Sequence, residues 1–139
     1  MHILIIGGIS RSLINFRGPL IRAMLAAGHK VTACAGTPLP EVEKTLAEWG
    51  VQFVPVPLAR AGMNPVHDLF LCFKLVTLLR RLRPDAILSY TIKPVIWGGL
   101  ALRGNNQTRF YALVTGLGFA FQEGSLFRKL LTTLVSHLY

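Results

Sequence analysis

The chain alternates short apolar runs with longer stretches of mixed polarity, and glycine or proline separates most of them. Five apolar runs predict β-strands, at residues 2–6, 30–35, 51–54, 85–90 and 109–114. The intervening stretches predict helices, at residues 15–27, 41–49, 66–82, 95–102 and from 125 onward. Apolar strands that alternate with helices are typical of a parallel sheet covered on both faces. We therefore predict an α/β fold, a Rossmann-like doubly wound sheet in three layers with strand order 3-2-1-4-5.

In this order the first and fourth strands are neighbours where the connections diverge, which is where open α/β sheets bind ligands. Several groups after the first strand are suited to hold an anion, because they offer backbone amides, hydroxyls and guanidinium groups. They are Gly8, Ser10, Arg11, Ser12, Asn15 and Arg17. The alternative is that Ser10 and Asn15 only cap a helix and that both arginines face solvent.

Two further loops are expected at the same edge of the sheet. Thr91 and Lys93 follow the fourth strand and supply a hydroxyl and an ammonium group. Thr115, Gly116 and Gly118 follow the fifth strand, where glycines allow the backbone to approach a ligand closely. The segment 60–65, after the third strand, is equally consistent with a lid and with a turn.

The motifs exclude several kinds of site. The run from Gly7 to Ser12 lacks the third glycine of the dinucleotide-binding pattern, and the second strand ends without a carboxylate. No phosphate-binding loop of the NTPase type is present. The four histidines do not have metal-ligand spacing with Cys, Asp or Glu, so we expect neither a metal nor a cofactor. Catalytic residues stay unassigned.

The composition is apolar and basic. Hydrophobic residues make up 52% and charged residues only 15%, and 15 Lys and Arg against 6 Asp and Glu give a net charge of +9. Such a charge predicts an anionic partner. Because the basic residues do not form one concentrated patch, we expect a membrane surface rather than nucleic acid.

The compartment is predicted from the N-terminus, the apolar stretches and the cysteines. There is no signal peptide, and no uncharged apolar stretch is long enough to span a membrane. Cys34 and Cys72 are expected to be buried free thiols. The stretch 66–82 is apolar on almost all sides and has a basic end, which fits a core helix or, together with 127–131, a surface that rests on anionic lipid. We expect a cytoplasmic protein, peripheral on the inner face of the cell membrane.

Five motifs in order along the chain resemble the N-terminal half of family-four glycosyltransferases of the GT-B fold. They are ISRSLINFRGPL, AAGHKV, RAGMNP, RPDAILSYTIKPVIWG and YALVTGLGFAF. The resemblance is greatest to the bacterial branch that adds a sugar to undecaprenyl-diphosphate-linked acceptors. It implies that residues 1–139 form an acceptor-side domain and that a C-terminal domain, with paired glutamates for the nucleotide-sugar, is absent.

The resemblance also implies a reaction and its partners. A sugar would pass with retention, without a metal, from a nucleotide-sugar, UDP-linked, to a lipid-diphosphate-linked acceptor. The loop 8–15, Thr91, Lys93 and the segment 115–118 would line the cleft. The amides of the first loop, together with Ser10 and Arg11, would stabilise diphosphate charge. The family's histidine after the fifth strand is replaced by Thr115 or Gly116, so its role is not transferred.

Two alternatives remain open. The chain is also consistent with a non-catalytic membrane-associated subunit that pairs with a separate donor-domain chain, as in split glycosyltransferases. It is also consistent with a nucleotide-binding module of another kind. That alternative predicts that this chain alone binds a UDP-sugar tightly. The sugar, the acceptor and the linkage are not encoded in any motif that we find.

Overall fold

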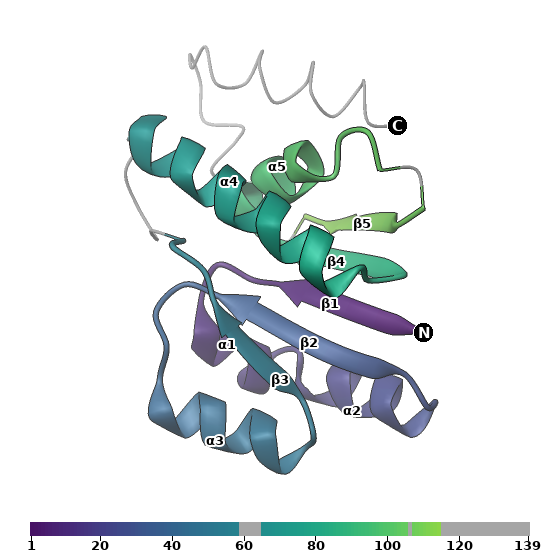
Figure 1. Ribbon diagram of the computed structural model, residues 1–139. Coiled ribbons are helices and arrows are strands. Elements are labelled where there is room, and N and C mark those ends of the chain that lie inside the picture. Colours follow the sequence, from purple (N-terminus) through teal and green to yellow (C-terminus); the bar gives the residue numbers. More distant parts are fainter. Residues whose placement is uncertain (59–64, 106, 115–139) are drawn as a thin grey trace.

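A computed structural model describes residues 1–58, 65–105 and 107–114 and contains a sheet of five parallel strands (Figure 1). The strand order is β3-β2-β1-β4-β5, which confirms the predicted topology. The strands are β1 (His2–Ile6), β2 (Lys30–Ala35), β3 (Gln52–Pro55), β4 (Ala86–Tyr90) and β5 (Arg109–Leu113).

Helices cover both faces of the sheet, as predicted (Figure 1). One face carries α1 (Ser10–Asn15), α2 (Gly18–Ala26) and α3 (Pro40–Glu48), and the other carries α4 (Pro65–Leu82) and α5 (Ile92–Ala101). None of the helices among the described residues is long and apolar enough to cross a membrane.

The central strand β1 shows why the sheet needs both layers. Its side chains alternate between two hydrophobic clusters, because successive residues of a strand point to opposite faces. Ile3 and Ile5 belong to the cluster under α1, α2 and α3, whereas Leu4 and Ile6 belong to the cluster under α4. A strand buried on both faces reads as one continuous apolar run, and this is the pattern that predicts it.

The first helix differs from its prediction. The pattern predicts a single helix over 15–27. Instead, α1 begins at Ser10 and ends at Asn15, and a second helix, α2, begins at Gly18. Pro19 explains the break: it has no N–H to donate to the carbonyl of Asn15, so the hydrogen-bond ladder of α1 cannot continue across it. Ser10, Arg11 and Ser12 therefore lie in a helix and not in a loop.

The helix after β4 also starts earlier than predicted. Pro94 suggests a start at Val95, but α5 begins at Ile92, and the N–H of Val95 donates to the carbonyl oxygen of Thr91 at 3.1 Å. Proline is tolerated here because the N–H groups of a first helical turn have no partner within the helix. The predicted loop 115–124 and the helix from 125 onward lie outside the described residues.

The cysteines are both free but differ in exposure. Cys34 is fully buried in β2, and burial raises the pKa of its thiol to about 12. Cys72 is only partly buried, contrary to the prediction, because α4 buries Leu71 and Leu75 instead and Cys72 lies one position round the helix.

Candidate functional site

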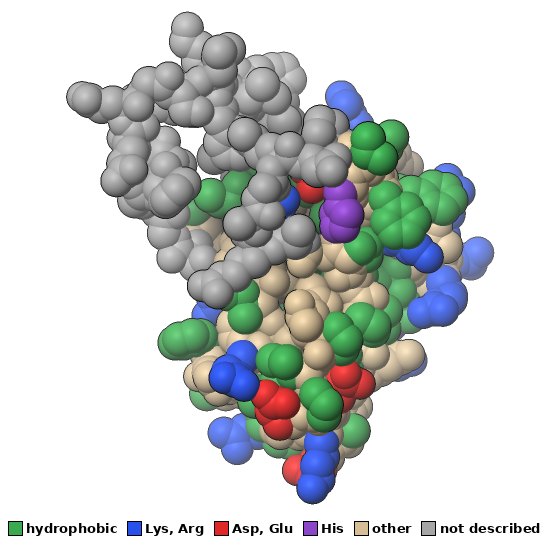
Figure 2. Space-filling model, turned by 90° about the vertical axis from the view of Figure 1, so that its left-hand side faces the viewer, with side chains coloured by type: hydrophobic (Ala, Val, Ile, Leu, Met, Phe, Trp, Pro, Cys, Tyr) green, Lys and Arg blue, Asp and Glu red, His purple; other side chains and the backbone are tan. Residues whose placement is uncertain are grey.

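The carboxyl edge of the sheet brings the predicted site residues together where β1 and β4 lie side by side. Ile6 of β1 pairs with Ser89 of β4. From there the chain passes from β1 to α1 on one face and from β4 to α5 on the other (Figure 1). Figure 2 looks onto this edge, where backbone and uncharged side chains drawn in tan fill the middle of the described surface, with basic, acidic and hydrophobic side chains around it. This is the position at which doubly wound sheets bind ligands.

Gly7 and Gly8 allow the end of β4 to approach the end of β1. A Cβ atom at residue 7 would lie 2.2 Å from the hydroxyl oxygen of Tyr90, and a Cβ atom at residue 8 would lie 2.8 Å from Oγ1 of Thr91. Neither glycine has a positive φ, so the requirement is for space and not for an unusual backbone conformation. Residues 90 and 91 therefore fill the room that the two glycines leave.

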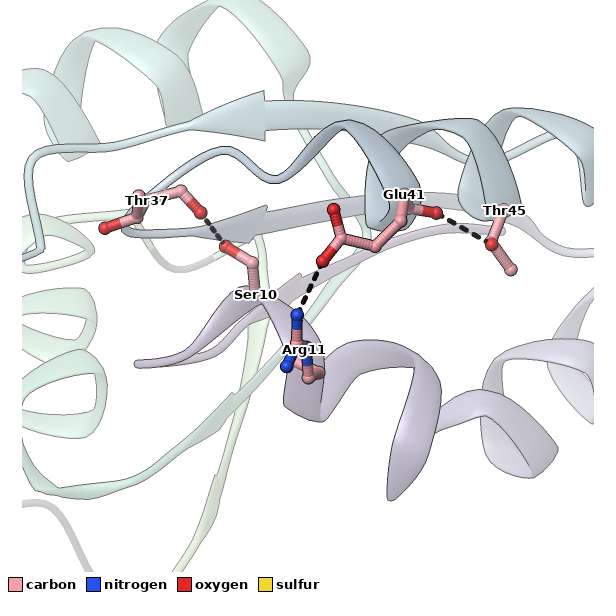
Figure 3. A network of polar contacts seen from close by, with 5 residues as sticks. All are labelled: Ser10, Arg11, Thr37, Glu41 and Thr45. Carbon is pink, nitrogen blue, oxygen red and sulfur yellow. Dashed lines mark hydrogen bonds and ion pairs between the residues drawn. The ribbon is translucent and has the colours of Figure 1, made fainter.

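Ser10 and Arg11 connect α1 to the segment after β2 (Figure 3). The hydroxyl of Ser10, which is 2% exposed, donates a hydrogen bond to the carbonyl oxygen of Thr37. The guanidinium of Arg11 forms an ion pair of 2.7 Å with Glu41 of α3 and holds the pKa of that carboxyl below its ordinary value. Both partners of the pair are largely exposed, so the pair opens at little cost.

Ser12, Arg17 and Tyr90 form a second group at the same edge. The hydroxyl of Ser12 donates to the carbonyl oxygen of Ile9 and lies 2.8 Å from the hydroxyl oxygen of Tyr90. The guanidinium carbon of Arg17 lies 4.7 Å from the centre of the Tyr90 ring. Burial raises the pKa of the Tyr90 phenol, although Ser12 and Arg17 both act in the opposite direction. The phenol is therefore neutral and can donate a hydrogen bond.

Lys93 is held on the other face of the sheet. Its ammonium group lies 3.3 Å from the carboxylate of Asp68, and the two side chains are 24% and 12% exposed. Asp68 stands in the first turn of α4, where a carboxylate is favoured by the helix dipole. Lys93 stands in the first turn of α5, where a cation is disfavoured, so Asp68 offsets the positive end of that helix.

Thr91 has a backbone conformation that side chains rarely adopt. It precedes α5 with φ 69° and ψ 154°, a region used almost only by glycine. Such a conformation costs about 1–3 kcal/mol and persists only where the surrounding structure imposes it. Here Thr91 connects the end of β4 to α5, and its Oγ1 atom occupies the space that a Cβ atom at residue 8 would need.

The structure brings together the predicted residues that follow β1 and β4, although Asn15 lies at the margin of this group. Asn15 ends α1 and is exposed. Thr115, Gly116 and Gly118 lie outside the described residues, as does the segment 60–64. No group of three potential metal ligands occurs among the residues that the structure describes.

Two residues at the site are not predicted from the sequence. The pattern indicates Tyr90 only as a strand residue and Asp68 only as an acid beside a helix, yet both hold cations at the edge. For Tyr90 a signal is present: two consecutive glycines at the end of a central strand indicate a bulky neighbour. No comparable signal marks Asp68.

The edge therefore carries three cations, of which Arg11 and Lys93 are paired with carboxylates and Arg17 lies over a ring, beside partly exposed backbone at Gly8. The parallel sheet with this strand order is that of one half of a GT-B architecture. The profile of glycosyltransferase family 4 matches residues 6–131, and the chain belongs to this family.

A curated relative has a similar sequence. The chain is 28% identical over 128 residues to the N,N'-diacetylbacillosaminyl-diphospho-undecaprenol α-1,3-N-acetylgalactosaminyltransferase of Campylobacter jejuni, a match that covers 92% of this chain and 34% of that protein. The chain thus spans about a third of the length of this relative.

The solved structures share the fold at low sequence identity. MurG of Acinetobacter baumannii aligns with a TM-score of 0.60 at 16% identity, over 80% of this chain and 33% of that one. The UDP-GlcNAc 2-epimerase of Neisseria meningitidis aligns with a TM-score of 0.61 at 13% identity, over 96% and 38%. Because an epimerase and a MurG share this fold, the fold alone does not define the reaction.

We predict that removing the backbone strain at Thr91 measurably raises the free energy of unfolding. Thr91→Gly removes the Cβ atom, whereas Thr91→Ala keeps it, and both remove the hydroxyl. Relief of about 1–3 kcal/mol of strain exceeds the roughly 0.5–1 kcal/mol that glycine costs through the unfolded chain. Thr91→Gly is expected to be about 1 kcal/mol more stable than Thr91→Ala in urea unfolding. Equal stability of the two variants would contradict the strain.

Proposed function

We propose that this chain is the acceptor-side domain of a retaining glycosyltransferase. In the whole enzyme a sugar passes from a nucleotide-sugar, UDP-linked, to a lipid-diphosphate-linked acceptor in polysaccharide or glycan assembly. A second domain, separate from residues 1–139, binds the nucleotide-sugar. The observation that carries the proposal is the cationic carboxyl edge between β1 and β4 in a chain of family 4.

The chemistry of the edge suits a diphosphate. Arg11, Arg17 and Lys93 each bring a positive charge to the carboxyl ends of β1 and β4, and Gly8 exposes backbone at the same place. A lipid diphosphate carries several phosphate oxygens, which accept charge-assisted hydrogen bonds from such groups. The Campylobacter jejuni relative is a diphospho-undecaprenol transferase, which supports this acceptor class.

The partial engagement of the cations is consistent with ligand binding. Arg11 pairs with an exposed carboxylate, and Lys93 pairs with a partly buried one. An anionic ligand competes with Glu41 for Arg11 at small cost because their pair is open to solvent. Ser10 acts differently: its buried hydroxyl fixes the start of α1 and so positions the amides around Gly8.

A membrane surface is the proposed second partner. The outer side of α4 exposes Leu69, Phe70 and Phe73, which are 69%, 50% and 67% exposed. They are spaced as one helical stripe, and Lys74, Arg80 and Arg81 continue along the same helix. Apolar side chains beside cations suit the interface of an anionic bilayer, where the acceptor lipid resides. We place the protein on the cytoplasmic side of the membrane on this basis.

The first prediction from this proposal concerns the ligand class. The chain is expected to bind an undecaprenyl-diphosphate-linked sugar in detergent micelles at least about tenfold more tightly than undecaprenyl monophosphate, because the second phosphate adds charge-assisted hydrogen bonds. Calorimetric titration measures both affinities. Tight binding of a UDP-sugar, with no affinity for the lipid diphosphate, would overturn the proposed division of labour.

The second prediction concerns Arg11. Arg11→Ala is expected to weaken binding of the lipid diphosphate about tenfold, the value of one charge-assisted contact. Glu41→Gln is expected to tighten it, because the competing carboxylate is gone. Lys44→Ala removes an exposed charge elsewhere on α3 and is the matched control. If Arg11→Ala binds no more weakly than Lys44→Ala, Arg11 does not touch the diphosphate.

The third prediction concerns the membrane. The double variant Phe70→Ser, Phe73→Ser is expected to lose at least about tenfold in binding to phosphatidylglycerol vesicles, since burial of each phenylalanine contributes about 1.5–3 kcal/mol. Phe16→Ser removes an aromatic that is 74% exposed on the other helical layer and is the control. Co-sedimentation measures the bound fraction. Equal loss in the control, or equal binding to neutral phosphatidylcholine vesicles, would argue against this surface.

A further inference from the structure

Tyr90 has polar neighbours that an ordinary core aromatic does not need. It is 2% exposed and belongs to the hydrophobic cluster beneath α1 and α2. Its hydroxyl meets the hydroxyl of Ser12, and the guanidinium of Arg17 lies over its ring. Two different elements, α1 and the residue that precedes α2, thus place a polar group on the same side chain.

The absence of a side chain at Gly7 makes this arrangement possible. A Cβ atom at Gly7 would lie 2.2 Å, 2.4 Å and 2.9 Å from three atoms of Tyr90. Any other residue at position 7 would displace the ring from beneath Arg17. Gly7 itself continues the pairing of the sheet, because its N–H donates to the carbonyl oxygen of Cys34 at 2.9 Å. The position of the ring is therefore fixed from below by the backbone.

Arg17 forms no ion pair with a carboxylate among the residues that the structure describes. Its Nε atom is buried, and within the same residues it has no hydrogen-bond acceptor. An unsatisfied buried donor is unfavourable, and attraction to an aromatic face offsets only part of that cost. The residue as a whole is partly exposed. This is the environment of a cation that can accept an anionic ligand.

We propose that Tyr90 is a positioning residue for the diphosphate site. Its ring holds Arg17 with the guanidinium directed to the carboxyl edge, where it binds a phosphate group of the acceptor. Its hydroxyl fixes Ser12 and with it the first turn of α1. The inference rests on the proposed function, because it takes a diphosphate to be the ligand of this edge.

The arrangement predicts which part of Tyr90 matters. Tyr90→Phe keeps the ring under Arg17 and loses only the contact with Ser12. Tyr90→Leu loses the ring as well, so Arg17 is no longer held. Arg17→Met removes the cation itself. The effect of the ring passes through Arg17, and coupled effects are non-additive.

The test measures affinity for inorganic pyrophosphate and for the undecaprenyl-diphosphate-linked sugar. Tyr90→Leu and Arg17→Met are each expected to weaken binding of both ligands about tenfold, and the double variant is expected to bind no more weakly than Arg17→Met alone. Tyr90→Phe is expected to lose less than Tyr90→Leu. Tyr111→Leu, which removes an exposed tyrosine from β5, is the control.

A spectroscopic readout separates positioning from a structural role. In the wild-type chain the Nε–H resonance of Arg17 is expected to be shifted upfield by the ring of Tyr90 and to move when pyrophosphate is added. Tyr90→Phe keeps the upfield shift, and Tyr90→Leu loses it. If Tyr90→Leu does not fold, Tyr90→Phe and Arg17→Met still provide the comparison.

The outcomes separate the inference from the function on which it rests. If the wild-type chain binds neither ligand, the proposed function fails. If the wild-type chain binds both and Arg17→Met binds equally well, the inference alone is overturned. Additive losses in the double variant would also overturn it, because Tyr90 would then act on binding by a route other than Arg17.

Discussion

Van der Waals exclusion at the ends of two neighbouring strands governs the architecture of this site. Gly7 and Gly8 leave β1 without side chains where β4 ends, and Tyr90 and Thr91 occupy the space so created. The phenol then reaches α1, and the chain enters α5 through a strained residue. The cations on both sides of the sheet are set relative to this contact. Larger residues at positions 7 and 8 would separate the strand ends and remove the frame on which the charges are placed.

The electrostatics of the edge follow from how few acids the chain contains. With 6 Asp and Glu against 15 Lys and Arg, the carboxylates are too few to pair one-to-one with the cations. The three cations at the edge are held in different ways: Arg11 by an exposed glutamate, Lys93 by a partly buried aspartate and Arg17 by an aromatic ring. An aromatic face restrains a guanidinium without neutralising it, so Arg17 keeps its full charge for a ligand.

The fold was predictable from the sequence because each buried strand is a continuous apolar run, and right-handed crossovers leave few topologies. The ends of the helices were less predictable. Pro19 and Pro94 do lie in the first turns of helices, α2 and α5, but no signal in the sequence indicates that a separate helix, α1, begins at Ser10. The site was predictable at the correct edge, since glycines and cations follow β1 and β4. The residues that hold those cations were not, because Tyr90 and Asp68 act through contacts between elements distant in sequence.

The short segment from Tyr90 to Lys93 has a mechanical consequence. Tyr90 lies with the helical layer of α1 and α2, whereas Lys93 contacts α4 in the opposite layer, and only Thr91 and Ile92 separate them. A small rotation of this segment about its own axis would swing the two side chains in opposite directions. The ion pair of Lys93 in one layer and the ring contact of Tyr90 in the other therefore hold the same short stretch of backbone from opposite faces of the sheet.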